Sequence, residues 1–194
     1  MFWSANKQEQ ELVSSLGLTP EPPKSDANVD RAGLYVQDAV GSKLEYYLSQ
    51  KVTASQAVCR ADGRQSYRLS FDLTSQVPGD PLKSVPAYVL GVYKGEKVPA
   101  GTMRLDVMTY APDGSTIVGG SVNGTAFDPG KLKDGANPVS KVRVEIPPGA
   151  TVNVTFDIVA AKAGEKALDV TVTPLVRATP ITKGALDCGT VASK

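Results

Sequence analysis

Residues 43–74 read KLEYYLSQKVTASQAVCRADGRQSYRLSFDLT, and this stretch decides the fold class. In its first half the even-numbered positions are the more apolar ones: Leu44, Tyr46, Leu48, Val52, Ala54 and Val58. Alternation with a period of two is typical of a strand that buries one face and exposes the other. The stretch therefore predicts a long half-buried strand, with Tyr46 in the core and Tyr47 on the opposite face of the sheet.

The second half of the stretch predicts the partner of this strand. Asp62-Gly63 is a hairpin signal, because both residues accept the backbone conformations that a tight turn requires. Beyond the turn, apolar residues alternate again with polar ones, at Tyr67, Leu69, Phe71 and Leu73. We therefore expect an antiparallel hairpin at the centre of a mainly β domain.

The rest of the chain continues the same pattern. Pro112-Asp113-Gly114 and Pro147-Pro148-Gly149 each lie between two alternating segments and predict two further hairpins, because proline fixes φ and glycine accepts positive φ. A last alternating strand begins near residue 167 and is ended by Pro174. Seven to nine strands without helical crossovers predict an antiparallel immunoglobulin-like β-sandwich, with a closed antiparallel barrel as the alternative.

The first residues predict a short helix over 4–16, with Ser4 as its N-cap and Gly17 in the left-handed position after its end. A proline-rich segment follows. The expected organisation is therefore a helix and linker over 1–32, a β-sandwich over 33–178 and a C-terminal tail over 179–194.

The two cysteines, Cys59 and Cys188, allow two interpretations. The favoured one is a disulfide, because the tail around Cys188 has few apolar residues to anchor it; the alternative is two unrelated buried thiols. In the chain-entropy model, closing so long a loop stabilises the fold by about 4–5 kcal/mol. A disulfide would also indicate an oxidising, extracytoplasmic compartment.

Composition excludes several functional classes. The chain of 194 residues has a net charge of +1 and no histidine. Because it also has no run of Lys and Arg, nucleic acid is not an expected partner. The missing histidine removes the usual general base and the commonest zinc ligand, so we expect neither a metal nor a cofactor. No apolar run approaches the length needed to span a bilayer, so a membrane contact would come only through an anchor upstream of this chain.

One corner of the chain is the candidate binding site. It comprises Asp38, Ser42, Lys43, Glu45 and Tyr47. An exposed tyrosine there could stack on a sugar ring, and Asp38 with Glu45 could serve as the paired carboxylates of a glycosidase. The competing interpretation is a structural corner in which Asp38 and Lys43 form a solvated ion pair. The pattern assigns no catalytic residue.

Several stretches resemble a known family. GLYVQDAVGSKLEYYL over residues 33–48 resembles a segment of an uncharacterised family of actinobacterial membrane-anchored cell-envelope proteins, and FWSANKQEQELVSSLGL is similar to the helix that leads into it. CRADGRQSYRLSFDLTS and IPPGATVNVTFDIV are similar to later parts of that family. The resemblance implies a location outside the membrane, with this chain as a C-terminal region. It implies no reaction.

Taken together, the sequence favours a non-catalytic extracytoplasmic module of a cell-envelope protein with an interaction, scaffolding or glycan-contact role. The expected partner is cell-wall glycan or another envelope protein. The alternative is a part of a carbohydrate-active or cell-wall polymer-processing enzyme that uses carboxylates. A third hypothesis is a module that stabilises a domain upstream, with the helix over 4–16 as the joint.

Overall fold

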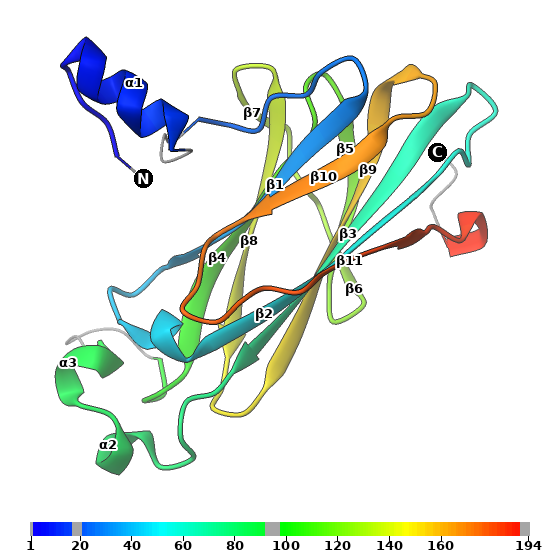
Figure 1. Ribbon diagram of the computed structural model, residues 1–194. Helices are drawn as coiled ribbons and strands as arrows, with labels where there is room; N and C mark the ends of the chain where they lie inside the picture. The colour runs from blue at the N-terminus through cyan, green and yellow to red at the C-terminus, as the bar shows by residue number, and fades with distance from the viewer. Residues whose placement is uncertain (1, 17–20, 92–97, 191–194) are drawn as a thin grey trace.

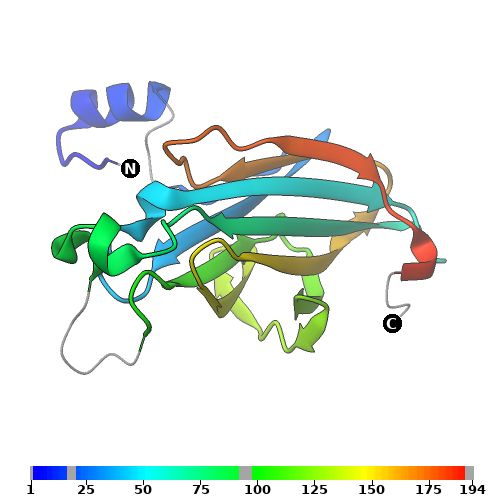
Figure 2. The same cartoon turned by 90° about the horizontal axis from the view of Figure 1, so that it is seen from below.

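The computed structural model describes residues 2–16, 21–91 and 98–190 and shows two sheets packed face to face (Figures 1 and 2). Sheet A contains, in spatial order, β10 (Ala167–Val172), β1 (Val29–Asp38), β4 (Met103–Tyr110), β8 (Asn137–Ile146) and β7 (Leu132–Asp134). Sheet B contains β11 (Ile181–Ala185), β2 (Leu48–Ala57), β3 (Arg64–Ser75), β9 (Thr151–Ala163), β5 (Thr116–Val122) and β6 (Thr125–Phe127). The mainly β sandwich is confirmed. The closed barrel is wrong, because each sheet ends in two edge strands.

The predicted central hairpin is present. Strands β2 and β3 pair antiparallel, with Val52 opposite Phe71. The turn between them places Gly63 at φ 72°, and the Gly63 N–H donates to the carbonyl of Arg60 at 3.1 Å. The four alternating residues of the return strand are all buried, as predicted: Tyr67, Leu69, Phe71 and Leu73.

The core is one apolar layer between the sheets. Its largest fully buried side chains are Tyr67, Phe71, Phe156, Leu34, Leu44, Leu48, Leu69, Leu73, Met103, Leu105, Ile146 and Ile158. They come from both sheets and from the segment that joins β1 to β2. Burying a side chain of this size stabilises the fold by about 1.5–3 kcal/mol. Each sheet therefore gives one face to the core and leaves the other free.

The two further hairpins predicted from proline-glycine turns are wrong in topology. Both turns form: Ser115 N–H donates to the Pro112 carbonyl at 3.0 Å, and Ala150 N–H donates to the Pro147 carbonyl at 3.0 Å. However, β4 and β8 lie in sheet A, whereas the strands that follow them, β5 and β9, lie in sheet B. These turns are therefore crossings between sheets. The same local turn chemistry serves a hairpin or a crossing, and only the long-range pairing of the strands distinguishes them.

The expectation of purely antiparallel sheets is wrong at two edges. Strand β10 pairs with β1 in parallel, and β11 pairs with β2 in parallel. Parallel neighbours are distant in sequence, so no local turn signal reports them. Strand β11 also lies within residues 179–194, the segment expected to be a tail. Strand β10 ends before Pro174, as predicted.

Two hairpins within the sheets were not predicted. Strands β5 and β6 are joined by Asn123 and Gly124, which have φ values of 48° and 80°. Strands β7 and β8 are joined through Gly135, at φ 58°. Asn-Gly is a strong hairpin signal because both residues accept positive φ. The sequence therefore carried a signal for the first of these hairpins.

The start of the central strand differs from the prediction. Leu44–Tyr47 forms a short 3-10 helix, η1, and β2 begins only at Leu48. The tighter helical turn reverses the expected sides of the tyrosine pair: the Tyr46 side chain is 57% exposed, and Tyr47 packs against the core. Val58 lies beyond the end of β2 and is also exposed.

The N-terminal helix α1 is Lys7–Ser15, and its N-cap is Asn6 instead of Ser4. The Asn6 side-chain oxygen accepts from the backbone N–H groups of Gln8 and Glu9, which is the bonding pattern that defines an N-cap. Ser4 hydroxyl instead donates to the Glu9 carboxylate at 2.6 Å. Gly17 lies outside the described residues. Helix α1 buries none of its residues, and the figures show it apart from the sheets (Figure 1).

The remaining short helices lie at opposite ends of the sandwich. Helices α2 (Pro81–Ser84) and α3 (Ala87–Leu90) lie at the same end as η1, and η2 (Cys188–Thr190) lies at the other (Figures 1 and 2).

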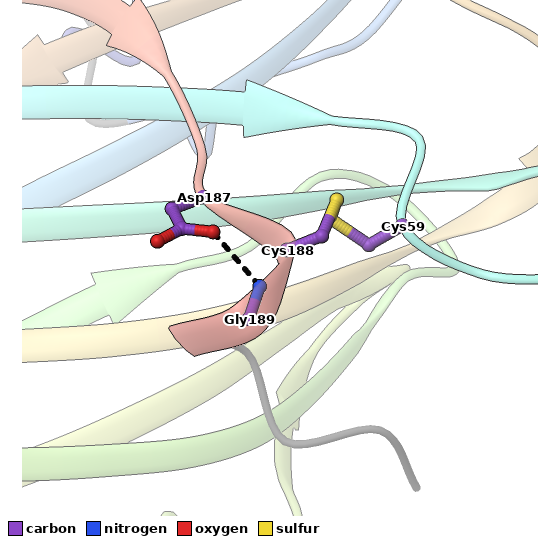
Figure 3. The surroundings of a disulfide bond; sticks show 4 residues. All are labelled: Cys59, Asp187, Cys188 and Gly189. Carbon is purple, nitrogen blue, oxygen red and sulfur yellow. Dashed lines mark hydrogen bonds between the residues drawn. A yellow bond between two sulfur atoms is a disulfide. The ribbon is translucent and has the colours of Figure 1, made fainter.

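The predicted disulfide is confirmed, so the alternative of two unrelated thiols is wrong. Cys59 follows β2 and Cys188 begins η2, and their Cα atoms are 5.2 Å apart (Figure 3). All five residues of β11 are exposed. It is therefore held by backbone pairing with β2, by the buried Leu186 that follows it and by this covalent bond.

We expect the Cys59→Ser/Cys188→Ser variant to lose stability and to release β11 first. The free energy of unfolding should fall by up to about 4–5 kcal/mol, because the loop is no longer closed in the unfolded chain. Urea unfolding and hydrogen exchange of residues 181–185 measure the two effects. Lys183→Ala, which keeps the disulfide, is the control. Unchanged protection of β11 in the double variant would contradict this account.

Candidate functional site

The corner proposed from sequence is held together by Asp38. Its Oδ1 accepts from the backbone N–H groups of Val40 and Ser42, both at 2.9 Å. Its Oδ2 accepts from the Ser42 hydroxyl at 2.5 Å. Both oxygens of Asp38 are thus engaged in turning the chain from β1 towards η1. The Lys43 ammonium lies over the Tyr88 ring, 5.2 Å from its centroid, so the expected Asp38–Lys43 pair is wrong.

The corner that Asp38 holds together packs against α3. Lys43 N–H donates to the Val89 carbonyl at 2.9 Å. Gly91 ends α3 at φ 63°, and a Cβ there would lie 2.6 Å from the Ser42 Cα. Only glycine fits this position without moving backbone. Ser42 is consequently buried, and its role is structural.

The remaining two candidates of the corner differ in exposure. Glu45 is half-buried, and burial is the main cause that raises the pKa of its carboxyl, with the charge of Asp38 as a smaller cause. Tyr47 is partly buried against the core, and Tyr46 instead faces solvent, with the Arg177 guanidinium 6.0 Å from its ring centroid. A glycosidase pair needs a second available carboxylate, and both oxygens of Asp38 already accept hydrogen bonds within the corner.

A groove on the outer face of sheet A was not found from the sequence. Its volume is about 360 Å³, and it is lined by Glu21, Pro22, Tyr35, Val36, Gln37, Met108, Tyr110, Asp134 and Thr173. These residues come from the linker, from β1, β4 and β7, and from the segment after β10. We call it the tyrosine groove.

Two tyrosines form its aromatic corner. The distal half of the Tyr35 ring lies over Gly33: a Cβ on Gly33 would be 2.4 Å from Tyr35 Cε2. Gly33 also pairs with Tyr110 across β1 and β4. The two rings meet edge to face, with centroids 5.6 Å apart and an interplanar angle of 78°. One face of the Tyr35 ring therefore lies against the backbone, and the Tyr110 ring lies beside it, nearly perpendicular to it.

Polar groups surround this aromatic corner. Tyr110 hydroxyl donates to Asp134 Oδ2 at 3.3 Å. The Thr173 hydroxyl oxygen accepts from Val36 N–H at 3.0 Å, which leaves its own proton available. Burial is the main cause that raises the pKa of both Tyr35 and Tyr110 above the usual value. Both phenols are therefore neutral hydrogen-bond donors at neutral pH. An aromatic surface with a few oriented polar groups is typical of a small-molecule or sugar site.

A second hollow, of about 430 Å³, lies around Asp30 and Lys166. Tyr67 hydroxyl donates to the buried Asp30 carboxylate at 2.7 Å, and Lys166 Nζ donates to it at 3.1 Å. Burial is the main cause that raises the pKa of Tyr67, with the bond to Asp30 next. This cluster consists of mutually satisfied groups that link β1, β3 and the start of β10. Within the described ranges, no three Cys, Asp or Glu side chains gather closely enough to hold a metal ion.

Comparisons with known proteins establish no family. No protein-family model matches the chain, and no curated protein matches it. Among solved structures, a Legionella pneumophila protein named "putative nutrient binding protein" is similar, with a TM-score of 0.38 and 10% identity. The match covers 70% of this chain and 44% of the other, so this chain spans less than half of that protein's length. A similarity this distant carries no argument about function. The resemblance to envelope proteins stays a prediction.

We expect Gly33→Ala to disturb the aromatic corner specifically. Its Cβ would occupy the space of the Tyr35 ring, so the ring must leave Gly33 and its contact with Tyr110. An aromatic pair contributes about 0.5–1.5 kcal/mol, and the free energy of unfolding should fall by about that amount. The near-UV circular dichroism of the tyrosines should change as well.

Gly119→Ala is the matched control for this change. Gly119 also lies in a strand, and a Cβ there would meet no atom closer than 3.7 Å. Both substitutions reduce the entropy of the unfolded chain equally. The difference between their effects on the free energy of unfolding therefore reports the displacement of the Tyr35 ring. Identical effects of the two substitutions would show that Tyr35 does not lie on Gly33.

Proposed function

We propose that this chain is a non-catalytic, immunoglobulin-like β-sandwich module of an extracytoplasmic cell-envelope protein, and that it contacts glycan through the tyrosine groove. The observation that carries the proposal is the aromatic corner of Tyr35 and Tyr110. A pyranose ring has one face made mostly of C–H groups, and such a face packs on the electron-rich face of an aromatic ring. The hydroxyls of the sugar then need the oriented polar groups that Asp134, Gln37 and Thr173 supply.

The disulfide supports the location. Bonds such as Cys59–Cys188 persist in oxidising compartments and are rare where thiols are kept reduced. In the described parts of the chain, no helix has both the length and the apolarity to cross a membrane.

The enzyme alternative is less well supported by the geometry. Glu45, with its raised pKa, is suited to donate a proton. Its intended partner Asp38 accepts three hydrogen bonds from the corner itself. A carboxylate that holds the backbone in this way is not positioned to attack a substrate or activate water. We therefore favour binding over hydrolysis.

We expect Tyr110→Ala to weaken glycan binding by at least about tenfold, because one of the two rings of the aromatic corner is removed. A tenfold loss corresponds to about 1.4 kcal/mol. Co-sedimentation with chitin, cellulose and purified peptidoglycan sacculi measures the binding. Tyr88→Ala is the control, since Tyr88 is 70% exposed and lies on α3 outside the groove. Circular dichroism verifies that both variants fold.

Two results would contradict the proposal. Binding that is lost in Tyr88→Ala and kept in Tyr110→Ala would place the site at the other end of the sandwich. Failure of the unmodified protein to bind any of the three polymers would dismiss the glycan role.

A further inference from the structure

The charged residues described in the lining of the tyrosine groove are both acidic. Of its nine lining residues, Glu21 and Asp134 are the charged ones, and both are carboxylates. Among the residues that the structure describes, no lysine or arginine lines this groove. A bound ligand therefore meets hydrogen-bond acceptors and negative charge at the rim, and neutral tyrosine hydroxyls inside.

Two cations on the same face of the sheet are directed to another carboxylate. Asp106 lies two residues from Met108 on β4, and its Oδ1 accepts from Arg143 Nε at 2.7 Å. Lys141 Nζ donates to Asp106 Oδ2 at 3.1 Å. The bond from Arg143 is the main cause that lowers the pKa of Asp106, so this carboxylate stays charged and keeps both cations beside it. Asp106 cancels one of these two positive charges, and both cations are directed to its carboxylate.

Asp134 is the carboxylate closest to the aromatic corner. It ends the three-residue strand β7 and accepts from the Tyr110 hydroxyl. Its charge is, after burial, a cause that raises the pKa of Tyr110. Glu21, by contrast, has a cation of its own, since Lys24 Nζ lies 2.6 Å from its carboxylate. Asp134 is therefore the charged group in direct contact with Tyr110.

We infer that the tyrosine groove takes a neutral or amine-bearing glycan and rejects an acidic one, and that Asp134 sets this selectivity. The inference rests on the proposed glycan-binding function and names the class of glycan that the groove binds. A uronate or phosphate group beside the exposed carboxylate of Asp134 would bring two like charges together, which costs binding free energy at low salt. A sugar amine would instead form a charge-assisted hydrogen bond with the same carboxylate.

Three oligosaccharides of similar length test the inference: a chitin oligomer, which is neutral, its deacetylated form, which carries amines, and an oligogalacturonate, which carries carboxylates. Isothermal titration calorimetry at low salt gives the three dissociation constants. We expect the unmodified protein to bind the neutral or the amine-bearing oligomer at least about tenfold more tightly than the oligogalacturonate. The preference between amine and carboxylate should shrink as salt is added, because exposed charges are screened.

Asp134→Lys tests the role of the residue. It should weaken binding of the amine-bearing oligomer and strengthen that of the oligogalacturonate, so that the order of the two is reversed. Asp134→Asn should remove the preference without reversing it.

Asp169→Lys is the matched control, because it makes the same change of net charge on β10, outside the groove lining, at an exposed position. It should leave the order of the three ligands unchanged.

The outcomes separate this inference from the proposed function. If Tyr110→Ala abolishes binding but the unmodified protein prefers the oligogalacturonate, the glycan site stands and the charge selectivity is wrong. The same holds if Asp134→Lys and Asp169→Lys change the order equally. If none of the oligosaccharides binds, the proposed function and this inference both fall.

Discussion

The apolar layer between the two sheets is made from one face of each sheet, and this constraint shapes everything else in the molecule. Side chains alternate along a strand, so each residue that enters the core, such as Leu34 or Phe71, is followed by one that faces outwards. The core therefore fixes where the outward-facing side chains lie. It does not fix which residue types they are. Strand pairing then decides which outward residues become neighbours. Gly33 and Tyr110 are far apart in sequence, and the pairing of β1 with β4 places them side by side.

The two candidate sites use their polar groups in opposite ways. At the corner, Asp38 and Ser42 bond to each other and to the backbone, and Lys43 is fixed by Val89 and Tyr88. Those bonds fix the chain segment that crosses from sheet A to sheet B. Few polar groups of the corner then remain to bind a ligand. In the tyrosine groove the sheet already supports the rings, and Asp134 accepts from the Tyr110 hydroxyl, which is itself part of the groove. A rigid strand surface with oriented aromatic groups is suited to binding because little conformational entropy is lost when the ligand arrives.

Local patterns predicted local structure and failed where long-range pairing decides. The alternation in β3 and the Asp62-Gly63 turn specified the central hairpin, and the weakly apolar tail indicated the disulfide. The proline-glycine turns were recognised, but whether the chain returns in the same sheet or crosses to the other depends on strands far away. Strand β11 escaped prediction because its residues are exposed and its partner is parallel. The tyrosine groove could have been suspected from Gly33 two positions before Tyr35, since a glycine on the outer face leaves room for a ring; its second half required the register with β4.

Nuclear magnetic resonance mapping of backbone amides during titration with a chitin oligosaccharide tests the central claim most directly, because it reports where on the intact chain the ligand lies. The account predicts that the largest shifts occur in residues 33–37 of β1 and 106–110 of β4, with Asp134 included. Shifts concentrated instead in residues 38–47, or on the outer face of sheet B, would contradict it.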